Sequence, residues 1–181
     1  MTPVETVDQP APAYLRWLKA FLVLIVLTLI AMWVYAFGFA PRAGVNPVKD
    51  PVWTDGAQAA CIDAATQLQP LIFKKKVQDT TDLQAYATNM DQAALVFDHM
   101  LDTIAALPRT SDRAVVVVPQ WLADFRIWVT DLRAWTQKLH AGERAIFGVS
   151  LTDTGIPVDE RINTFATENR IKECRIDRLQ G

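Results

Sequence analysis

The residues Ala20 to Ala40, AFLVLIVLTLIAMWVYAFGFA, contain no charged side chain. A helix rises about 1.5 Å per residue, so a helix of this length matches the hydrocarbon core of a bilayer, which is roughly 30 Å thick. Lipid offers no hydrogen-bond partner to the backbone, and a lone apolar segment can therefore cross a membrane only as a helix. The sequence predicts one membrane span, with the lipid bilayer as the partner of Ala20–Ala40.

The residues before this segment indicate where the span begins. Residues 1–13, MTPVETVDQPAPA, contain three prolines and few apolar side chains, which predicts a disordered tail. Aromatic and cationic side chains follow and are typical of a membrane interface, so we expect residues 14–40 to form a transmembrane helix with an interfacial collar of Tyr14, Arg16, Trp17 and Lys19. A cleaved signal peptide is the alternative, with Gly38 and Ala40 before the cut, but the long apolar segment and Pro41 favour a signal-anchor.

Residues 41–53, PRAGVNPVKDPVW, contain three spaced prolines and predict an extended linker. Residues 54–181 are numerous enough to form one domain with its own core. Apolar residues recur in this region at helical spacing, and only seven glycines occur in the whole chain, which favours helices over a sandwich or barrel. The formal net charge of −2 gives no indication of nucleic-acid binding.

Four helices are expected in residues 54–181. The first begins at Thr54 or Asp55, either of which can cap it, and Pro70 should kink it or end it early. The second runs from Thr81 or Asp82 to Leu107 and has a heptad stripe on one face: Leu83, Tyr86, Met90, Ala93, Phe97, Met100, Ile104 and Leu107.

The third helix is expected from about Ser111 to His140. Its first turns are expected to be separate or kinked, because the β-branched residues Val115 to Val118 precede Pro119; a short strand is the alternative there. The buried face is expected to hold Val115, Val118, Leu122, Phe125, Val129, Leu132 and Leu139. A shorter fourth helix should run from about Val158 to Arg170, followed by a polar tail.

The predicted fold class is therefore all-α, with one N-terminal transmembrane helix followed by an up-down-up-down four-helix bundle. In such a bundle the start of the first helix and the end of the fourth lie at the same end. Cys61 and Cys174 occupy these two positions, so we expect one disulfide to close the bundle. Two unrelated buried thiols are the alternative.

Membrane orientation follows from this disulfide, because a disulfide persists in an oxidising compartment. Basic residues are nearly balanced across the span, with Arg16 and Lys19 before it and Arg42 and Lys49 after it. We therefore expect a single-pass protein of the cell membrane with a cytoplasmic N-terminus and the C-terminal domain outside the cytoplasm.

No pattern of catalytic residues is found. The histidines His99 and His140 lie on different predicted helices without a second ligand at helical spacing, so both are interpreted as surface residues and no metal site is predicted. No glycine-rich phosphate loop and no nucleophile motif occurs either. The sequence predicts no catalytic residue and no cofactor, and favours a protein that is not an enzyme.

Two features suit the binding of a partner. Trp121, Trp128 and Trp135 repeat every seven residues and can form either the core or a recognition surface. The connection of residues 141–156 is long for a bundle and carries Ile146 and Phe147. It is interpreted either as a lid over the bundle or as a docking loop, and these five residues form the candidate partner surface.

The layout from Tyr14 to Cys174, an anchor followed by an alanine-rich helical domain with a late cysteine, resembles that of small single-pass membrane proteins of high-GC Gram-positive bacteria. The resemblance is one of layout and implies no role for any residue. The leading hypothesis is a non-enzymatic accessory or scaffolding subunit that binds another membrane or envelope protein. The alternative is a domain that senses or binds a small apolar molecule near the three tryptophans.

Overall fold

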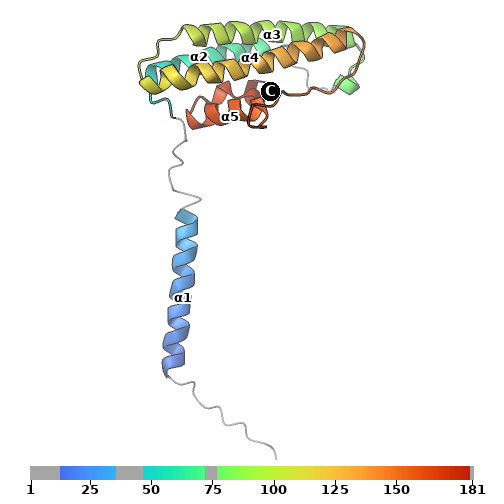
Figure 1. Cartoon of the computed structure of the whole chain (residues 1–181). Helices are drawn as coiled ribbons and strands as arrows, with labels where there is room; N and C mark the ends of the chain where they lie inside the picture. The colour runs from blue at the N-terminus through green and yellow to red at the C-terminus, as the bar shows by residue number, and fades with distance from the viewer. Residues whose placement is uncertain (1–12, 36–46, 72–76, 180–181) are drawn as a thin grey trace, which may run out of the picture. The chain divides into compact units, whose positions relative to one another are not determined.

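The computed structural model describes residues 13–35, 47–71 and 77–179, and these residues form helices and loops without a β-strand. The chain divides into two compact units, Met1–Arg42 and Ala43–Gly181. Figure 1 shows the first as the single helix α1 and the second as a group of packed helices. The prediction of an all-α protein is confirmed for the described residues.

The described residues of the first unit form the helix α1 (Ala13–Val34). The window Trp17–Val34 is long and apolar enough to cross a membrane, and none of it is buried within the structure. Its length and composition fit a membrane span and a signal sequence alike. The expected disordered tail, apart from Ala13, and the last residues of the expected span, 36–40, lie outside the described residues.

The first helix of the second unit is α2 (Pro51–Leu68), which starts earlier than the predicted Thr54 or Asp55. The cap is Asp50 rather than Thr54 or Asp55: its carboxylate accepts a hydrogen bond from the Trp53 backbone N–H at 3.2 Å. Pro51 occupies the first turn, where a missing N–H is not needed. The described end of the expected linker is thus part of the helical domain, with Val48 and Asp50 buried.

The short helix η2 (Val77–Asp79) precedes the two longest helices of this unit, α3 (Leu83–Ala106) and α4 (Asp112–His140). Asp82 caps α3 through the Ala85 N–H, and Ser111 caps α4 through the Ala114 N–H. Both helices agree with the predicted ranges within two residues. The expectation of separate first turns in α4 is wrong, because the helix continues through Pro119.

Aromatic and aliphatic side chains of α2, α3 and α4 fill the core of the second unit. The stripe predicted on α3 contains no exposed residue, and the predicted face of α4 is buried except for Val115, which is 56% exposed. Trp121 lies near the centre of a cluster of rings, with Trp53 at 6.0 Å, Phe125 at 5.6 Å and Phe165 at 5.2 Å between centroids.

Three short helices complete the domain: α5 (Val158–Glu168), η3 (Lys172–Cys174) and α6 (Ile176–Leu179). The helix α5 packs against α4, while η3 and α6 pack against α2. The expected polar tail is wrong for Ile176 and Leu179, which are buried, whereas Asp177 and Arg178 between them are exposed.

The predicted disulfide is confirmed. Cys61 of α2 and Cys174 of η3 are joined across 113 positions of sequence, with 5.1 Å between their Cα atoms. Both cysteines are completely buried. The disulfide therefore ties the C-terminal helices to the first helix of the domain. The up-down-up-down arrangement of a four-helix bundle stays a prediction.

Candidate functional site

The three tryptophans of the candidate partner surface lie in different surroundings along α4. Trp121 and Trp128 are buried, and Trp135 is partly buried. Trp121 stacks on Phe165 of α5, while Trp128 packs edge-on against Phe97 of α3 at 5.1 Å. In this conformation the first two tryptophans contribute to the core, and only Trp135 reaches the surface.

The connection between α4 and α5, which we name the strap (residues 141–157), lies along α4. Phe147 of the strap inserts between two of the tryptophans, with its ring centroid 5.7 Å from Trp128 and 5.5 Å from Trp135. The structure thus brings Phe147, Trp128 and Trp135 together and leaves Trp121 apart from them. Ile146, the residue before Phe147, is 84% exposed.

Polar contacts hold the strap at three further points. The Trp135 indole Nε1 donates to the Ala145 carbonyl at 2.8 Å, and the Arg144 guanidinium donates to the Val77 carbonyl at 2.6 Å. Asp131 of α4 accepts hydrogen bonds from the backbone N–H and the hydroxyl of Ser150, each at 2.7 Å. These contacts favour the interpretation of the strap as a lid.

The strap nevertheless leaves aliphatic side chains in contact with solvent. Leu151 is 65% exposed and Ile156 is 42% exposed. Ile127 of α4, which is 43% exposed, lies one helical turn before Asp131, the residue that binds Ser150. We name this set of Ile127, Ile146, Leu151 and Ile156 the strap patch. A lid and a docking surface are therefore compatible: Phe147 faces inward and its neighbours face outward.

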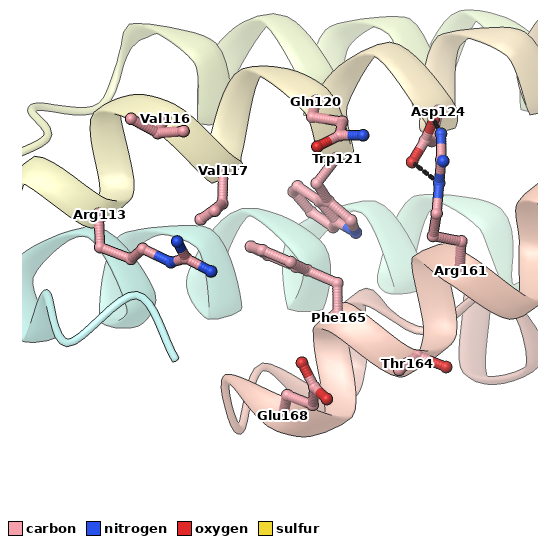
Figure 2. Close-up of a pocket in the computed structure, with 10 residues that line it drawn as sticks. All are labelled: Arg113, Val116, Val117, Gln120, Trp121, Asp124, Arg161, Thr164, Phe165 and Glu168. Carbon is pink, nitrogen blue, oxygen red and sulfur yellow. Dashed lines mark hydrogen bonds and ion pairs between the residues drawn. The ribbon is translucent and has the colours of Figure 1, made fainter. Parts of the chain in front are cut away.

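A groove of about 500 Å³ lies between α4 and α5. Figure 2 shows Trp121 and Phe165 on its inner side, with Val116 and Val117 toward one end. Its remaining lining residues are polar or charged: Arg113, Gln120, Asp124, Arg161, Thr164 and Glu168. The groove combines an apolar floor with polar edges, a combination common in small-molecule sites.

One end of the groove is closed by the ion pair between Asp124 of α4 and Arg161 of α5. Asp124 is only 3% exposed, and Arg161 Nε donates to it at 2.6 Å while the guanidinium NH2 group makes a second bond. The hydrogen bond to Asp124 keeps the pKa of Arg161 above its ordinary value, despite partial burial. A charge buried in this way requires its partner, so the pair fixes α5 on α4.

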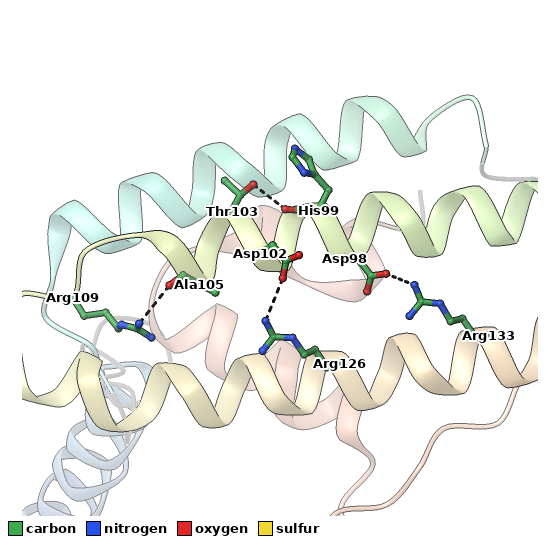
Figure 3. A network of polar contacts seen from close by, with 8 residues as sticks. All are labelled: Asp98, His99, Asp102, Thr103, Ala105, Arg109, Arg126 and Arg133. Carbon is green, nitrogen blue, oxygen red and sulfur yellow. Dashed lines mark hydrogen bonds and ion pairs between the residues drawn. The ribbon is translucent and has the colours of Figure 1, made fainter.

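Ionic contacts also join the outer faces of α3 and α4. Figure 3 shows Asp98 paired with Arg133 and Asp102 paired with Arg126, the second pair at 3.4 Å. These side chains are well exposed, so each pair contributes about 1 kcal/mol or less to stability.

The two histidines lie on different helices and do not share a contact that the structure shows. His99 is exposed on α3, whereas His140 of α4 contacts Asp91 at 2.7 Å and Gln84 at 3.0 Å, both on α3. Among the described residues, no group of three or more His, Cys, Asp and Glu side chains could hold a metal ion.

A cluster of buried polar contacts surrounds Asp50, a residue that was not among the predicted site residues. Besides capping α2, its carboxylate accepts hydrogen bonds from the backbone N–H groups of Thr110 at 2.5 Å and Ser111 at 3.1 Å. Burial raises the pKa of Asp50, but the hydrogen bonds from Thr110, Trp53 and Ser111 outweigh this and leave the pKa below its ordinary value.

Two other contacts extend this cluster. The Ser111 hydroxyl donates to the Val48 carbonyl at 2.6 Å, and the Val48 N–H donates to the Asn169 side chain at 2.6 Å. The segment at which the chain enters the domain is thus joined to the start of α4 and the end of α5. An acidic residue before a proline is a cap signal in the sequence, but its partners near Thr110 are not.

Comparison of the chain with protein-family models, with curated protein sequences and with solved structures gives no match.

Proposed function

We propose that the chain is a single-pass membrane protein whose helical domain, a disulfide-closed four-helix bundle, lies outside the cytoplasm. In this proposal it serves as a non-enzymatic accessory or scaffolding subunit of a membrane or envelope complex. The proposal rests on the presence of two features in one chain: the unburied apolar helix α1 and the Cys61–Cys174 disulfide. The first suits lipid, and the second suits an oxidising compartment.

The strap patch supports a role in protein assembly. Its four aliphatic side chains are exposed although Phe147, in the same segment, is packed between tryptophans. Exposed aliphatic side chains that gather in one segment and on the helix beside it are a candidate for a protein interface. Another membrane or envelope protein that covers Ile146 and Leu151 would remove this apolar area from water.

Cross-linking in native membranes tests the scaffolding role. A photoreactive amino acid at position 146 should capture a specific membrane or envelope protein, and the same probe at Leu95 of α3, which is 56% exposed, should not capture it. Capture of the same proteins from both positions, or from neither, contradicts the role of the strap patch.

The groove between α4 and α5 supports a second candidate, the binding of a small apolar molecule. Such a ligand would contact Trp121 and Phe165, and it would change the fluorescence of Trp121. The control is a Trp121→Phe variant, in which a ligand-dependent change should be lost. A change that survives in this variant would place the ligand elsewhere.

A further inference from the structure

The chain enters the helical domain between the starts of α2 and α4. Val48 and Asp50 precede α2, and hydrogen bonds join them to Thr110 and Ser111, which precede α4. Residues within two helical turns of either start therefore lie at the same end of the domain. We name the exposed part of this end the entry face, and define it by Lys49, Val52, Arg109, Val115 and Val116.

The entry face exposes three aliphatic side chains. Val52 is 60% exposed and Val115 is 56% exposed; Val116, which also lines the groove between α4 and α5, is 67% exposed. The core does not require them, since α2 and α4 bury other residues at this end, including Val48, Trp53, Ala114 and Val118. Three exposed valines thus lie in the first turns of two helices, at the end where the chain enters the domain.

Basic side chains accompany the valines. The exposed or partly exposed cations at this end are Lys49, Arg109, Arg113 and Arg170. The carboxylate of Asp50 is buried and bonded to backbone N–H groups, so it adds no negative charge to the surface. The exposed or partly exposed acids near this end are Asp55, Asp102, Asp112 and Glu168, so the cations that flank the valines are balanced in number by acids.

The length of the connecting chain determines what this surface can meet. The apolar sequence ends at Ala40 and the described domain begins at Pro47, so an extended chain between them covers at most about 25 Å. The helix α4 has 29 residues and is about 43 Å long at 1.5 Å per residue. If α1 spans a membrane, this connecting chain keeps Pro47 within about 25 Å of the end of the apolar segment, a distance shorter than the length of α4.

We propose that the entry face contacts the lipid headgroup surface of the membrane that α1 crosses. This inference depends on the proposed function, because it requires α1 to span. Aliphatic side chains flanked by Lys and Arg suit the boundary between headgroups and acyl chains, where the valines leave water and the cations meet lipid phosphates. Because the connecting chain of residues 41–46 keeps the domain near the membrane, the effective concentration of lipid at the entry face is high, and even a weak affinity for lipid would keep the two in contact. The strap patch then remains available for a protein partner.

Site-directed spin labelling of the full chain in vesicles of phosphatidylcholine and phosphatidylglycerol tests the proposal. Single cysteines replace Val116 on the entry face, Leu95 on α3 or Leu24 in α1, and the native disulfide leaves each introduced thiol as the one to label. Collision of the label with oxygen, which concentrates in lipid, is compared with collision with a water-soluble nickel chelate. Leu95 is the matched control, because it is also an exposed aliphatic residue on a helix.

We expect a several-fold higher ratio of oxygen to nickel accessibility at position 116 than at position 95, with position 24 higher still. Replacing Val52 and Val115 with Asp should lower the ratio at position 116 toward that at position 95. Equal ratios at 116 and 95 with a lipid-exposed label at 24 would overturn the membrane contact alone. A water-exposed label at 24 would overturn the proposed span, and the membrane contact with it.

Discussion

The helices α1 and α4 are both long and both rich in apolar residues, yet they are organised in opposite ways. Every described side chain of α1 is exposed, and its apolar residues surround the helix. The helix α4 buries one face against α3 and α5 and leaves charged residues such as Arg126 and Arg133 on the other. The comparison teaches that apolar content alone does not define the environment of a helix, whereas its periodicity does.

The two helices should therefore respond to different changes: α1 to anything that alters its fit to lipid, and the helical domain to anything that alters its buried contacts. The largest effect is expected at the disulfide of the domain. Replacing Cys61 and Cys174 together with Ser should lower the free energy of unfolding by about 4 kcal/mol, because the bond closes a loop of more than one hundred residues.

Urea unfolding of the full chain in nanodiscs, followed by circular dichroism, measures this loss. A reductant should destabilise the parent protein by a similar amount and leave the double variant unchanged. A double variant as stable as the parent would mean that the disulfide contributes nothing to the domain.

Placing one arginine in each region compares the regions directly. Leu24 of α1 and Leu95 of α3 are both exposed, at 62% and 56%. Leu24→Arg should cost about 3 kcal/mol of membrane insertion, because the cation would lie in the middle of the apolar helix, whereas Leu95→Arg should cost little. The amount of protein that resists carbonate extraction from membranes measures the difference, and equal amounts would remove the distinction between the helices.

The Asp50 cap is expected to have the next largest effect. Asp50→Ala removes the acceptor of three backbone N–H groups, two of them before α4, and should lower the free energy of unfolding by about 2 kcal/mol. Asp82→Ala is the control, because Asp82 is exposed and caps α3 through a single bond; it should cost about 1 kcal/mol. Equal losses in urea unfolding would contradict the wider role of Asp50.

The same carboxylate predicts a pH dependence. The folded-state pKa of Asp50 is below its ordinary value of 3.8, so the folded protein holds the charged form more firmly than the unfolded chain does. This contribution is fully present above pH 3.8 and is lost as the pH falls through the folded-state pKa. The Asp50→Asn variant should therefore lose less unfolding free energy than the parent protein when the pH falls below 3.8. Equal slopes of unfolding free energy against pH in the two proteins would contradict this role of Asp50.

The smallest of these effects separates the two faces of the strap. Phe147→Ser should lower the free energy of unfolding by about 1–2 kcal/mol, because the ring is partly buried between Trp128 and Trp135. Ile146→Ser should change stability by less than about 0.5 kcal/mol, because its side chain is 84% exposed. Thermal unfolding compares the two variants, and an equal loss would show that the strap has no inward face.

Local patterns in the sequence were sufficient for most helices. The heptad stripe from Leu83 to Leu107 predicted α3, because the periodicity of apolar residues reveals a helix directly. The position of Cys174 after α5 predicted the disulfide with Cys61, because the order of the helices places these two cysteines at the same end. Pro119 was misleading: packing of the buried face of α4 keeps the helix continuous through the proline. Ile176 and Leu179 are too few to give a pattern, and their burial depends on contacts of α6 with α2.

The candidate site was less predictable, because it depends on contacts between distant segments. The spacing of the tryptophans does not show that Trp121 faces α5 while Trp128 and Trp135 hold Phe147. The groove forms only where α5 packs on α4, and the ion pair between Asp124 and Arg161 holds α5 in that place. Asp50 carried a cap signal, but its bonds to Thr110 and Ser111 join residues about sixty positions apart.

The proposed function requires that α1 spans a membrane and that the helical domain lies outside the cytoplasm. Labelling of intact cells with an amine reagent that cannot cross membranes, followed by mass spectrometry, tests it most directly. The account predicts modification of the exposed residues Lys138 and Lys172 in the domain, and no modification of Lys19 until the membrane is opened. Modification of Lys19 with protection of Lys138 and Lys172 in intact cells would contradict it.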